Sequence, residues 1–353
     1  MRSFSGTLLP GNFIVLPVSK KLRAIGFSIN SSVILLVLAL LISTISFSQN
    51  AIVTENALPG NPASEWDIVG AGDPTIQGFS TELSVNKGQT IFFKIKTDAS
   101  DYSINIYRIG YYKGNGARRI ASGVITASLP QVQPQPLYET ATGKTDCSNW
   151  QESGKWIVPT TAVSGVYIAK LTRKDNGGSS HIIFIVRDDA AKSNLLFKTS
   201  DATWQAYNNY GGNALYDYIS SIPVPGFKQS VKVSYNRPFS NRGGNVGNGV
   251  RESFFFNAEY AMVRWLERNG YELTYTTQID MARRSTPLDL LKYKVLLSVG
   301  HDEYWSAEER AIFTSARNGG VNLAFFSGNE VYWKTRWEDN YKTLCMLQRR
   351  QSR

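Results

Sequence analysis

Cysteine, histidine and charge are all scarce in this sequence of 353 residues. It has two cysteines, Cys147 and Cys345, and two histidines, and charged residues make up 19% of the chain. Two cysteines do not build a disulfide framework, although they can pair with each other in an oxidising compartment. They also exclude a zinc cluster, which needs three or four closely spaced cysteine or histidine ligands. The 42% hydrophobic and 12% aromatic content excludes disorder, coiled coil and collagen.

The motifs of several enzyme classes are absent as well. No Gly-x-Ser-x-Gly occurs, which excludes a hydrolase with a nucleophile elbow. No P-loop and no Gly-x-Gly-x-x-Gly follows a strand-like segment. A cysteine amidotransferase needs its nucleophile at a strand–helix joint, where this chain has Gly300 and His301. The glycine-rich stretch 243–249 is typical of a flexible loop.

Excess positive charge is confined to the two ends of the chain. Four of the ten net positive charges lie in residues 1–48 and four follow Asp339, which leaves +2 for everything between. A region of such low charge has no broad electrostatic footprint for nucleic acid, so we expect no nucleic-acid partner.

Residues 1–49 are typical of a targeting segment. Lys20, Lys21 and Arg23 precede an apolar stretch, 33–47, that is short for a membrane span. A cleaved signal peptide is expected, with an uncleaved N-terminal membrane anchor as the alternative. Either way the sequence predicts a secreted or extracytoplasmic protein. At the other end, residues 341–353 lack any period and are basic, which predicts an aberrant tail on a domain that is cut short.

Two domains are expected between these ends. After a linker at 50–65, residues 66–190 contain alternating β-branched and aromatic segments separated by glycine-rich turns, which predicts an all-β sandwich. In residues 191–340 strand-like segments alternate with helical ones, as at 294–299, 306–318 and 321–326. Ser306 begins the intervening helix with Glu309 three residues on, the pattern of a capping box. We therefore expect an incomplete α/β domain with a mostly parallel sheet, of the Rossmann or glutamine-amidotransferase type.

Polar side chains follow three of the predicted strands. Ligands of open parallel sheets bind beyond the carboxyl ends of the strands, so these side chains should meet at one edge. His301 and Glu303 follow one strand, Asn329 and Glu330 another, and Tyr207 a third. Each of these residues also has a purely structural interpretation. His301 can be a hydrogen-bonded structural residue, and Tyr207 an ordinary loop tyrosine. Glu303, Asn329 and Glu330 can be helix-capping or solvated residues.

Tyr260 occupies a special place on the predicted helix 252–268. At 100° per residue it lies outside the apolar stripe formed by Phe254, Ala258 and Leu266. It therefore faces either solvent or a site.

Five segments resemble the C-terminal domain of the large (beta) subunit of N,N-dimethylformamidase. They are residues 203–212 (TWQAYNNYGG), 233–239 (VSYNRPF), 259–267 (EYAMVRWLE), 298–305 (SVGHDEYW) and 320–333 (GVNLAFFSGNEVYW). The resemblance covers about residues 100–340. It implies an amidase with a mononuclear Fe(3+) site held by two tyrosines and one glutamate, with a histidine two residues before that glutamate.

Carried onto this chain, the resemblance makes Glu303 a metal ligand and His301 its neighbour or proton carrier. Tyr207 is one expected phenolate ligand and Tyr260 the other, with Tyr235 as its substitute. Phenolate and carboxylate are hard oxygen donors suited to ferric iron. Asn329 and Glu330 complete the expected catalytic set. The resemblance also implies a small partner subunit or an oligomer.

Three functions remain open at this point. The first is a metal-dependent hydrolase of a small-molecule amide, inactive if the truncation removes part of its site. The second is a non-catalytic exported protein that binds carbohydrate or another ligand through Trp204, Tyr210, Trp305 and Trp333. The third is a glycosidase that uses Glu303 and Glu330 as its carboxylate pair.

Overall fold

The computed structural model describes residues 50–124, 127–243, 253–284 and 286–347, all within the unit Gln49–Arg353. The predicted targeting segment, most of the glycine-rich loop and the last six residues of the basic tail lie outside the described residues. No helix in the described ranges is long and apolar enough to cross a bilayer. Cys147 and Cys345 are both buried and unpaired.

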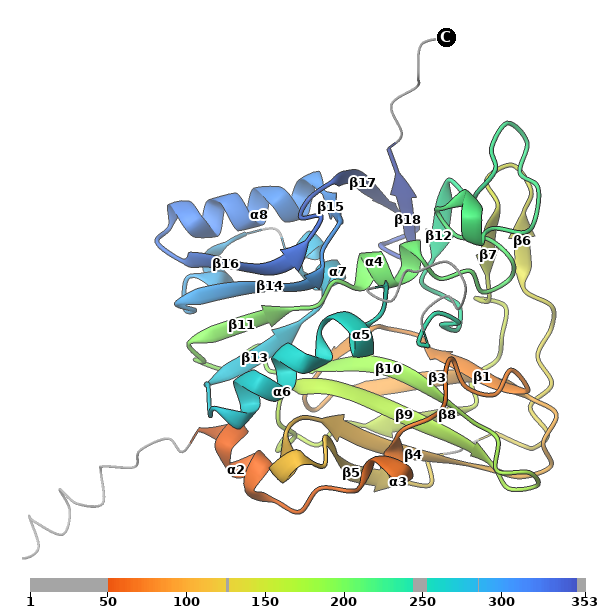
Figure 1. The fold of residues 1–353 in the computed structure, drawn as a ribbon, viewed down its shortest axis with the longest axis horizontal. Helices are drawn as coiled ribbons and strands as arrows, with labels where there is room; N and C mark the ends of the chain where they lie inside the picture. Colours follow the sequence, from red (N-terminus) through yellow and green to blue (C-terminus); the bar gives the residue numbers. More distant parts are fainter. Residues whose placement is uncertain (1–49, 125–126, 244–252, 285, 348–353) are drawn as a thin grey trace, which may run out of the picture. The chain divides into compact units, whose positions relative to one another are not determined.

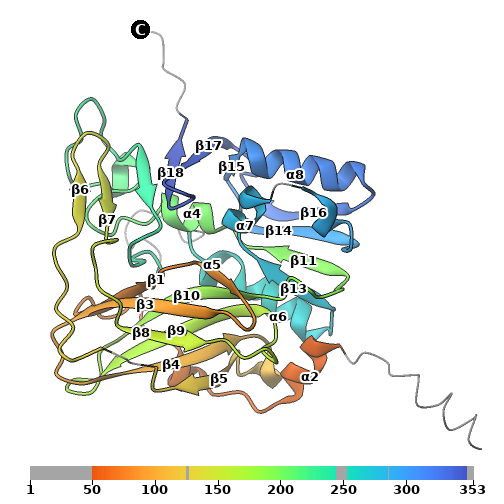
Figure 2. The same ribbon diagram turned by 180° about the vertical axis from the view of Figure 1, so that it is seen from behind.

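The first half of the described chain builds two facing sheets (Figure 1, Figure 2). A three-stranded antiparallel sheet has the order β1-β3-β8, with β1 Ile76–Ser80, β3 Thr90–Thr97 and β8 Gly154–Ile157. A five-stranded sheet has the order β2-β10-β9-β4-β5, with β2 Ser84–Asn86, β4 Tyr102–Ile109, β5 Ala117–Ser122, β9 Gly165–Arg173 and β10 Ser179–Arg187. Every second residue of β3 is buried, which directs Ile91 and Phe93 onto Ile104, Tyr167 and Phe184 of the facing sheet.

Short elements border these sheets. The segment predicted as a linker contains α2 Ala51–Ala57, capped by the side chain of Asn50, and α3 Ala63–Trp66 begins within it. A turn of 3-10 helix, η1 Tyr112–Gly114, follows β4, and β6 Leu137–Glu139 pairs with β7 Lys144–Asp146 as a hairpin. The described residues before 66 are therefore largely helical rather than extended.

A four-stranded parallel sheet forms most of the second half. Its order is β13-β11-β14-β16, with β11 Leu195–Lys198, β13 Leu273–Thr276, β14 Val295–His301 and β16 Asn322–Gly328. The helical elements are α4 Asp201–Ala206, η2 Asp217–Ile219, α5 Phe255–Ala258, α6 Tyr260–Arg268, α7 Gln278–Arg283, η4 Leu288–Leu290 and α8 Ala307–Asn318. Ser306 caps α8 as expected and accepts a hydrogen bond from the Glu309 amide. The predicted helix 252–268 is instead broken at Glu259, whose side chain is buried.

A second four-stranded sheet lies beside the carboxyl end of the parallel one (Figure 1). Its order is β12-β18-β17-β15, with β12 Lys232–Ser234, β15 Tyr304–Ser306, β17 Trp333–Glu338 and β18 Thr343–Met346. β15 and β17 run parallel, whereas the other two pairs are antiparallel. The buried strand β18 lies in a segment where the sequence predicted no regular element.

The prediction of a mostly parallel α/β domain of the Rossmann or glutamine-amidotransferase type behind an all-β sandwich is wrong. Strand residues outnumber helical ones in the described chain. The sheet β13-β11-β14-β16 is parallel, and every other sheet of the described residues contains at least one antiparallel pair. The error has a physical reason: the βαβ pattern identifies β14, α8 and β16 locally, but it carries no information about β12, β15, β17 and β18. These strands are three to six residues long, too short to show a period.

A buried ion pair joins the two halves of the described chain. The guanidinium of Arg108 on β4 donates to both carboxylate oxygens of Glu267 on α6, at 2.9 and 2.8 Å, and both side chains are fully buried. Tyr275 on β13 donates to the same carboxylate at 2.8 Å. Removal of one partner of a buried ion pair strongly destabilises the folded state. The pair therefore holds α6 against β4, which helps to position the edge of the sheet where the polar residues gather.

Candidate active site

Glu303 lies in the two-residue connection between β14 and β15, and its side chain is almost fully buried. Its amide donates to Thr203 Oγ1, and its carbonyl accepts from the amide of Trp333. Gly300, near the end of β14, has a φ of +97° that strains any residue with a Cβ, and a Cβ there would lie 2.6 Å from Glu259 Cγ. The backbone around Glu303 is thus held from three sides.

Two phenols hydrogen-bond to the two oxygens of this carboxylate. Tyr207, which ends α4, donates to Glu303 Oε2 at 3.0 Å, and Tyr216, just before η2, donates to Oε1 at 3.0 Å. Their rings stack with centroids 4.4 Å apart. Tyr304 on β15 donates to the Tyr216 hydroxyl, and Tyr218 hydrogen-bonds with Tyr207. We call Glu303 with these four tyrosines the phenol cluster.

Burial keeps these phenols protonated in the absence of a cation. Desolvation raises the pKa of Tyr207 and of Tyr216 well above the ordinary tyrosine range, and the charge of Glu303 raises both further. Desolvation raises the pKa of Tyr304 in the same way. The hydroxyls therefore act as neutral donors to Glu303 here, and a bound cation would favour their ionised form.

His301 and Asn329 adjoin the phenol cluster, as the sequence predicted. His301 Nε2 lies 3.2 Å from Glu303 Oε2, and the Asn329 side-chain nitrogen lies 3.2 Å from the same Nε2. The imidazole ring centroid is 5.7 Å from that of Tyr207. His301 Nδ1 is buried and has no hydrogen-bond partner among the described residues. The imidazole is thus placed to exchange a proton with the Glu303 carboxylate.

The structure separates Glu330 from this group. Its Oε1 lies 2.8 Å from Ser298 Oγ, and the same hydroxyl hydrogen-bonds with Asp302. Desolvation and the charge of Asp302 raise the pKa of Glu330. In the described contacts Glu330 belongs with Asp302 rather than with Glu303.

Tyr260 and Tyr235 are not brought to Glu303. The ring of Tyr260 packs against Trp66, Phe255 and Phe256, with centroids 5.4 to 6.2 Å away. The Tyr235 hydroxyl donates to Asp201 Oδ2 at 3.0 Å. The angle counted for Tyr260 from Phe254 is wrong, because the helix is broken at Glu259; its ring packs against the hydrophobic core and the α3 region.

Asp302, the neighbour of Glu303, points into a separate buried network. Lys198 on β11 donates to Asp302 Oδ2 and, at 2.9 Å, to Glu309 Oε1. The ammonium also lies 4.6 Å from the centroid of the Trp305 ring, and Gln278 donates to Glu309 Oε2 at 2.8 Å. Although burial opposes it, Asp302 and Glu309 raise the pKa of Lys198. We call Lys198, Asp302, Glu309 and Gln278 the lysine cluster.

The side chains around Glu303 that could bind a metal are mainly oxygen donors. In the described ranges no group of three or more His, Cys, Asp or Glu side chains is arranged to hold a metal ion. Glu303 has no Lys or Arg ion-pair partner there either; the His301 imidazole and two phenols are its side-chain contacts. A carboxylate with several phenols is a hard donor set that suits a small, highly charged cation such as ferric iron.

Sequence reasoning missed Tyr216, Tyr218 and Tyr304. Tyr216 and Tyr218 lie in an irregular segment around η2 that has neither helix nor strand period, so no pattern marked them. Tyr304 belongs to the 298–305 segment, but nothing in the sequence marks it as a partner of Tyr216. The aromatic residues proposed for ligand binding fare differently: Trp204 and Trp305 are 1% and 3% exposed and offer no ring face to a ligand.

Comparison with known proteins agrees with the resemblance. The family described as N,N-dimethylformamidase beta subunit-like, C-terminal matches residues 103–353. The N,N-dimethylformamidase beta subunit of Alcaligenes sp is 21% identical over 220 residues, which are 53% of this chain and 28% of that protein. The chain thus spans less than a third of the length of this relative.

Solved structures resemble the chain only weakly. Domain 1 of VCBP3 from Branchiostoma floridae covers 34% of this chain and 98% of its own, at 10% identity and a TM-score of 0.21. An uncharacterized protein from Bacillus anthracis str. Ames covers 30% and 82%, at 19% identity and a TM-score of 0.17. Scores this low carry no argument about the fold. The family match spans well over half of the chain, which therefore belongs to the N,N-dimethylformamidase beta subunit-like, C-terminal family.

Proposed function

We propose that this chain is a hydrolase that cleaves an amide bond with a ferric ion held by Glu303, Tyr207 and Tyr216. One observation carries the proposal: the two tyrosines hydrogen-bond to the two oxygens of one buried carboxylate, each at 3.0 Å. Family membership supports the reaction class, since the curated relative is named N,N-dimethylformamidase.

The donor set fits the proposed ion. Three oxygen ligands from an acid and two phenols carry three negative charges when ionised, which balances Fe(3+). Ferric iron in such a site supplies Lewis acidity, which polarises a carbonyl and lowers the pKa of water. Tyr216 replaces Tyr260 and Tyr235 as the second phenol in this proposal, because it is Tyr216 that contacts Glu303.

The neighbouring side chains have separate roles. His301, 3.2 Å from Glu303, carries a proton at Nε2 to or from the reacting groups. Asn329, 3.2 Å from the same nitrogen, orients the imidazole ring. Tyr304 donates to the Tyr216 hydroxyl and holds that phenol in place. Burial of Glu303 and Tyr207 excludes water from the side of the site that faces the protein interior.

Metal content and colour test the proposal. The full chain, produced in iron-supplemented medium, should contain about one iron per chain and show a phenolate-to-iron charge-transfer band in the visible spectrum. Tyr207→Phe, Tyr216→Phe and Glu303→Gln should each lose the band and most of the iron. Tyr260→Phe is the matched control and should keep both.

Three outcomes contradict this assignment. A colourless protein without iron contradicts the metal site. So does an iron content that is the same in the parent chain and in Glu303→Gln. Loss of the band in Tyr260→Phe with retention in Tyr216→Phe returns the second ligand to Tyr260. Turnover of N,N-dimethylformamide and of longer linear amides then tests the reaction. Export through residues 1–49 and a small partner subunit stay predictions.

A further inference from the structure

His181 on β10 is one of the two histidines of the chain, and it lies outside the phenol cluster. Both nitrogens of its partly buried ring have partners. Nε2 lies 2.8 Å from the carbonyl oxygen of Trp66, and Nδ1 lies 3.1 Å from Nε of Arg242. The ring centroid is 6.0 Å from that of Phe256 on α5. The imidazole therefore joins β10, the end of α3 and the segment that contains Arg242.

These two contacts fix the protonation state of the ring. The Nε of an arginine carries a hydrogen and can only donate, so Nδ1 of His181 accepts with its lone pair. A backbone carbonyl oxygen can only accept, so the hydrogen of the ring is on Nε2. One neutral tautomer satisfies both contacts. A proton added at Nδ1 would remove the acceptor of Arg242 and would place two cations 3.1 Å apart.

Arg242 connects this ring to the segment 67–70. Its guanidinium donates to the carbonyl oxygens of Ile68 and Gly70, each at 3.0 Å, and pairs with the carboxylate of Asp67. It thus bonds to three of the four residues of the segment, most of which is exposed to solvent. A change at His181 is therefore transmitted through Arg242 to the attachment of this segment.

The charged groups around His181 leave no acid to compensate an imidazolium. Lys170, the cross-strand neighbour of His181 on β9, is a second cation. Asp67 pairs with Arg242, and Glu65 pairs with an arginine of β5. Burial and then the charge of Arg242 lower the pKa of His181 well below the ordinary histidine range, and the charge of Lys170 acts in the same direction.

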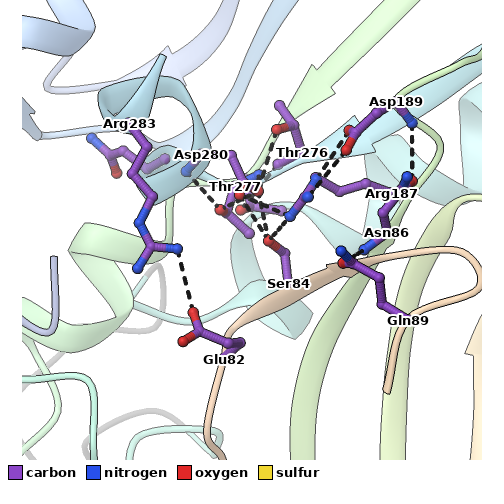
Figure 3. A network of polar contacts seen from close by, with 12 residues as sticks. Glu82, Ser84, Asn86, Gln89, Arg187, Asp189, Thr276, Thr277, Asp280 and Arg283 are labelled. Carbon is purple, nitrogen blue, oxygen red and sulfur yellow. Dashed lines mark hydrogen bonds and ion pairs between the residues drawn. The ribbon is translucent and has the colours of Figure 1, made fainter. Parts of the chain in front are cut away.

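Arg187 makes a similar attachment elsewhere on the molecule without a histidine (Figure 3). It pairs with Asp280 on α7 at 2.9 Å and with both oxygens of Asp189 at 3.1 Å. Carboxyl groups ordinarily titrate near pH 4 and imidazole near pH 6.5. Mild acid therefore distinguishes the two arginines, because only Arg242 depends on an imidazole.

We propose that His181 and Arg242 form a proton-sensitive latch, which holds residues 67–70 on β10 at neutral pH and releases them when Nδ1 gains a proton. The open state binds that proton more tightly than the closed state, because opening separates Nδ1 from Arg242. Acid therefore favours opening below about pH 6.5, and the latch is closed above it. The latch shares no residue with the phenol cluster, so it stands whether or not Glu303 holds a metal.

Hydrogen exchange of the full chain between pH 7 and pH 5, corrected for the intrinsic effect of pH on exchange, tests the latch. The amides of Asp67 and Gly72 are hydrogen-bonded when it is closed. Their opening equilibrium should rise about tenfold or more over this range, because the open state binds one proton with an ordinary histidine pKa. The amide of Asp189, beside Arg187, is the internal control and should change by less than about twofold.

Two variants separate the proton on the ring from the strength of the attachment. His181→Asn keeps an oxygen that can accept from Arg242 and cannot gain a proton, so the rise should disappear. Asp67→Asn weakens the same attachment without a change to the ring, and it should keep the rise. If His181→Asn does not fold, Arg242→Gln replaces it: its amide can donate to the neutral ring or accept from the protonated one, so the rise should again disappear.

The imidazole NMR spectrum gives an independent measurement, since the chain has only two histidines. His181 should carry its hydrogen on Nε2 at pH 7 and should stay neutral in the folded chain at pH 6. The proposal is overturned if His181 titrates near pH 6.5 in the folded parent chain. It is also overturned if the opening at Asp67 and Gly72 rises no more than that at Asp189, or if the rise persists in His181→Asn or Arg242→Gln.

Discussion

Asp302 and Glu303 are neighbours in the sequence, and both are buried, yet they have opposite surroundings. Asp302 lies in the lysine cluster, where Lys198 provides a fixed counter-ion shared with Glu309. Glu303 lies in the phenol cluster, where hydroxyl groups and one imidazole are its partners. A buried charge needs a partner of opposite sign. Asp302 has one built into the chain, and the ferric ion proposed above would be the corresponding partner of Glu303.

The comparison explains how one short connection serves two purposes. Successive residues of an extended chain point in opposite directions, so Asp302 and Glu303 reach different sides of the backbone. The lysine cluster ties β11, α7 and α8 together beneath the connection. These hydrogen bonds fix the connection that carries Glu303, as the proposed metal site would require.

Removal of the built-in counter-ion should have the largest effect. Lys198→Met leaves Asp302 and Glu309 buried without a cation, which should lower the free energy of unfolding by about 3–5 kcal/mol. Urea denaturation at neutral pH measures the change. Lys294→Met, at an exposed position, is the control and should stay within about 0.5 kcal/mol of the parent. A loss below about 1 kcal/mol for Lys198→Met would show that Lys198 is not the essential partner.

Asp201 is a third buried acid, and it belongs to neither the lysine cluster nor the phenol cluster. It accepts hydrogen bonds from the Gln278 amide, Thr199 and Tyr235, and desolvation raises its pKa to about 6. The folded state thus holds this proton more tightly than the unfolded state does. Its contribution to stability is therefore present below about pH 4 and is lost as the pH rises to about 6.

The isosteric variant Asp201→Asn should remove that dependence. At pH 7 its free energy of unfolding should exceed that of the parent by about 3 kcal/mol, and the difference should shrink toward zero near pH 4. Denaturation curves at several pH values measure this. A difference that does not change between pH 4 and 7 would mean that Asp201 is ionised throughout.

The smallest effect on stability is expected at Glu303. In metal-free protein Glu303→Gln keeps an acceptor oxygen for one of the two phenols, can donate from its amide nitrogen to the hydroxyl oxygen of the other, and removes a buried charge that has no fixed cation. The free energy of unfolding should therefore change by less than about 1 kcal/mol. Loading with iron should raise the melting temperature of the parent and leave that of the variant unchanged. Strong destabilisation of the metal-free variant would show that the Glu303 carboxylate, like that of Asp302, stabilises the fold without a bound cation.

Much of the local structure could be predicted from the sequence. The strand-like segments 294–299 and 321–326 marked β14 and β16, and Ser306 marked the start of α8. The rule that polar groups gather at the carboxyl ends of parallel strands placed His301, Glu303 and Tyr207 together, and the structure brings them within hydrogen-bond or ring contact. These predictions rest on burial patterns and end signals that act over a few residues.

What the sequence could not give is the partner of each element. Tyr216 lies in an irregular segment, and only the folded chain shows that it reaches the second oxygen of Glu303. The helical angle of Tyr260 was wrong because the helix is broken at Glu259, and only the folded chain shows that its ring meets Trp66 of α3, 194 residues earlier in the chain. Side-chain periodicity records whether a face is buried and not what covers it. The mixed sheet and the contact of Tyr216 with Glu303 were therefore decided by tertiary structure alone.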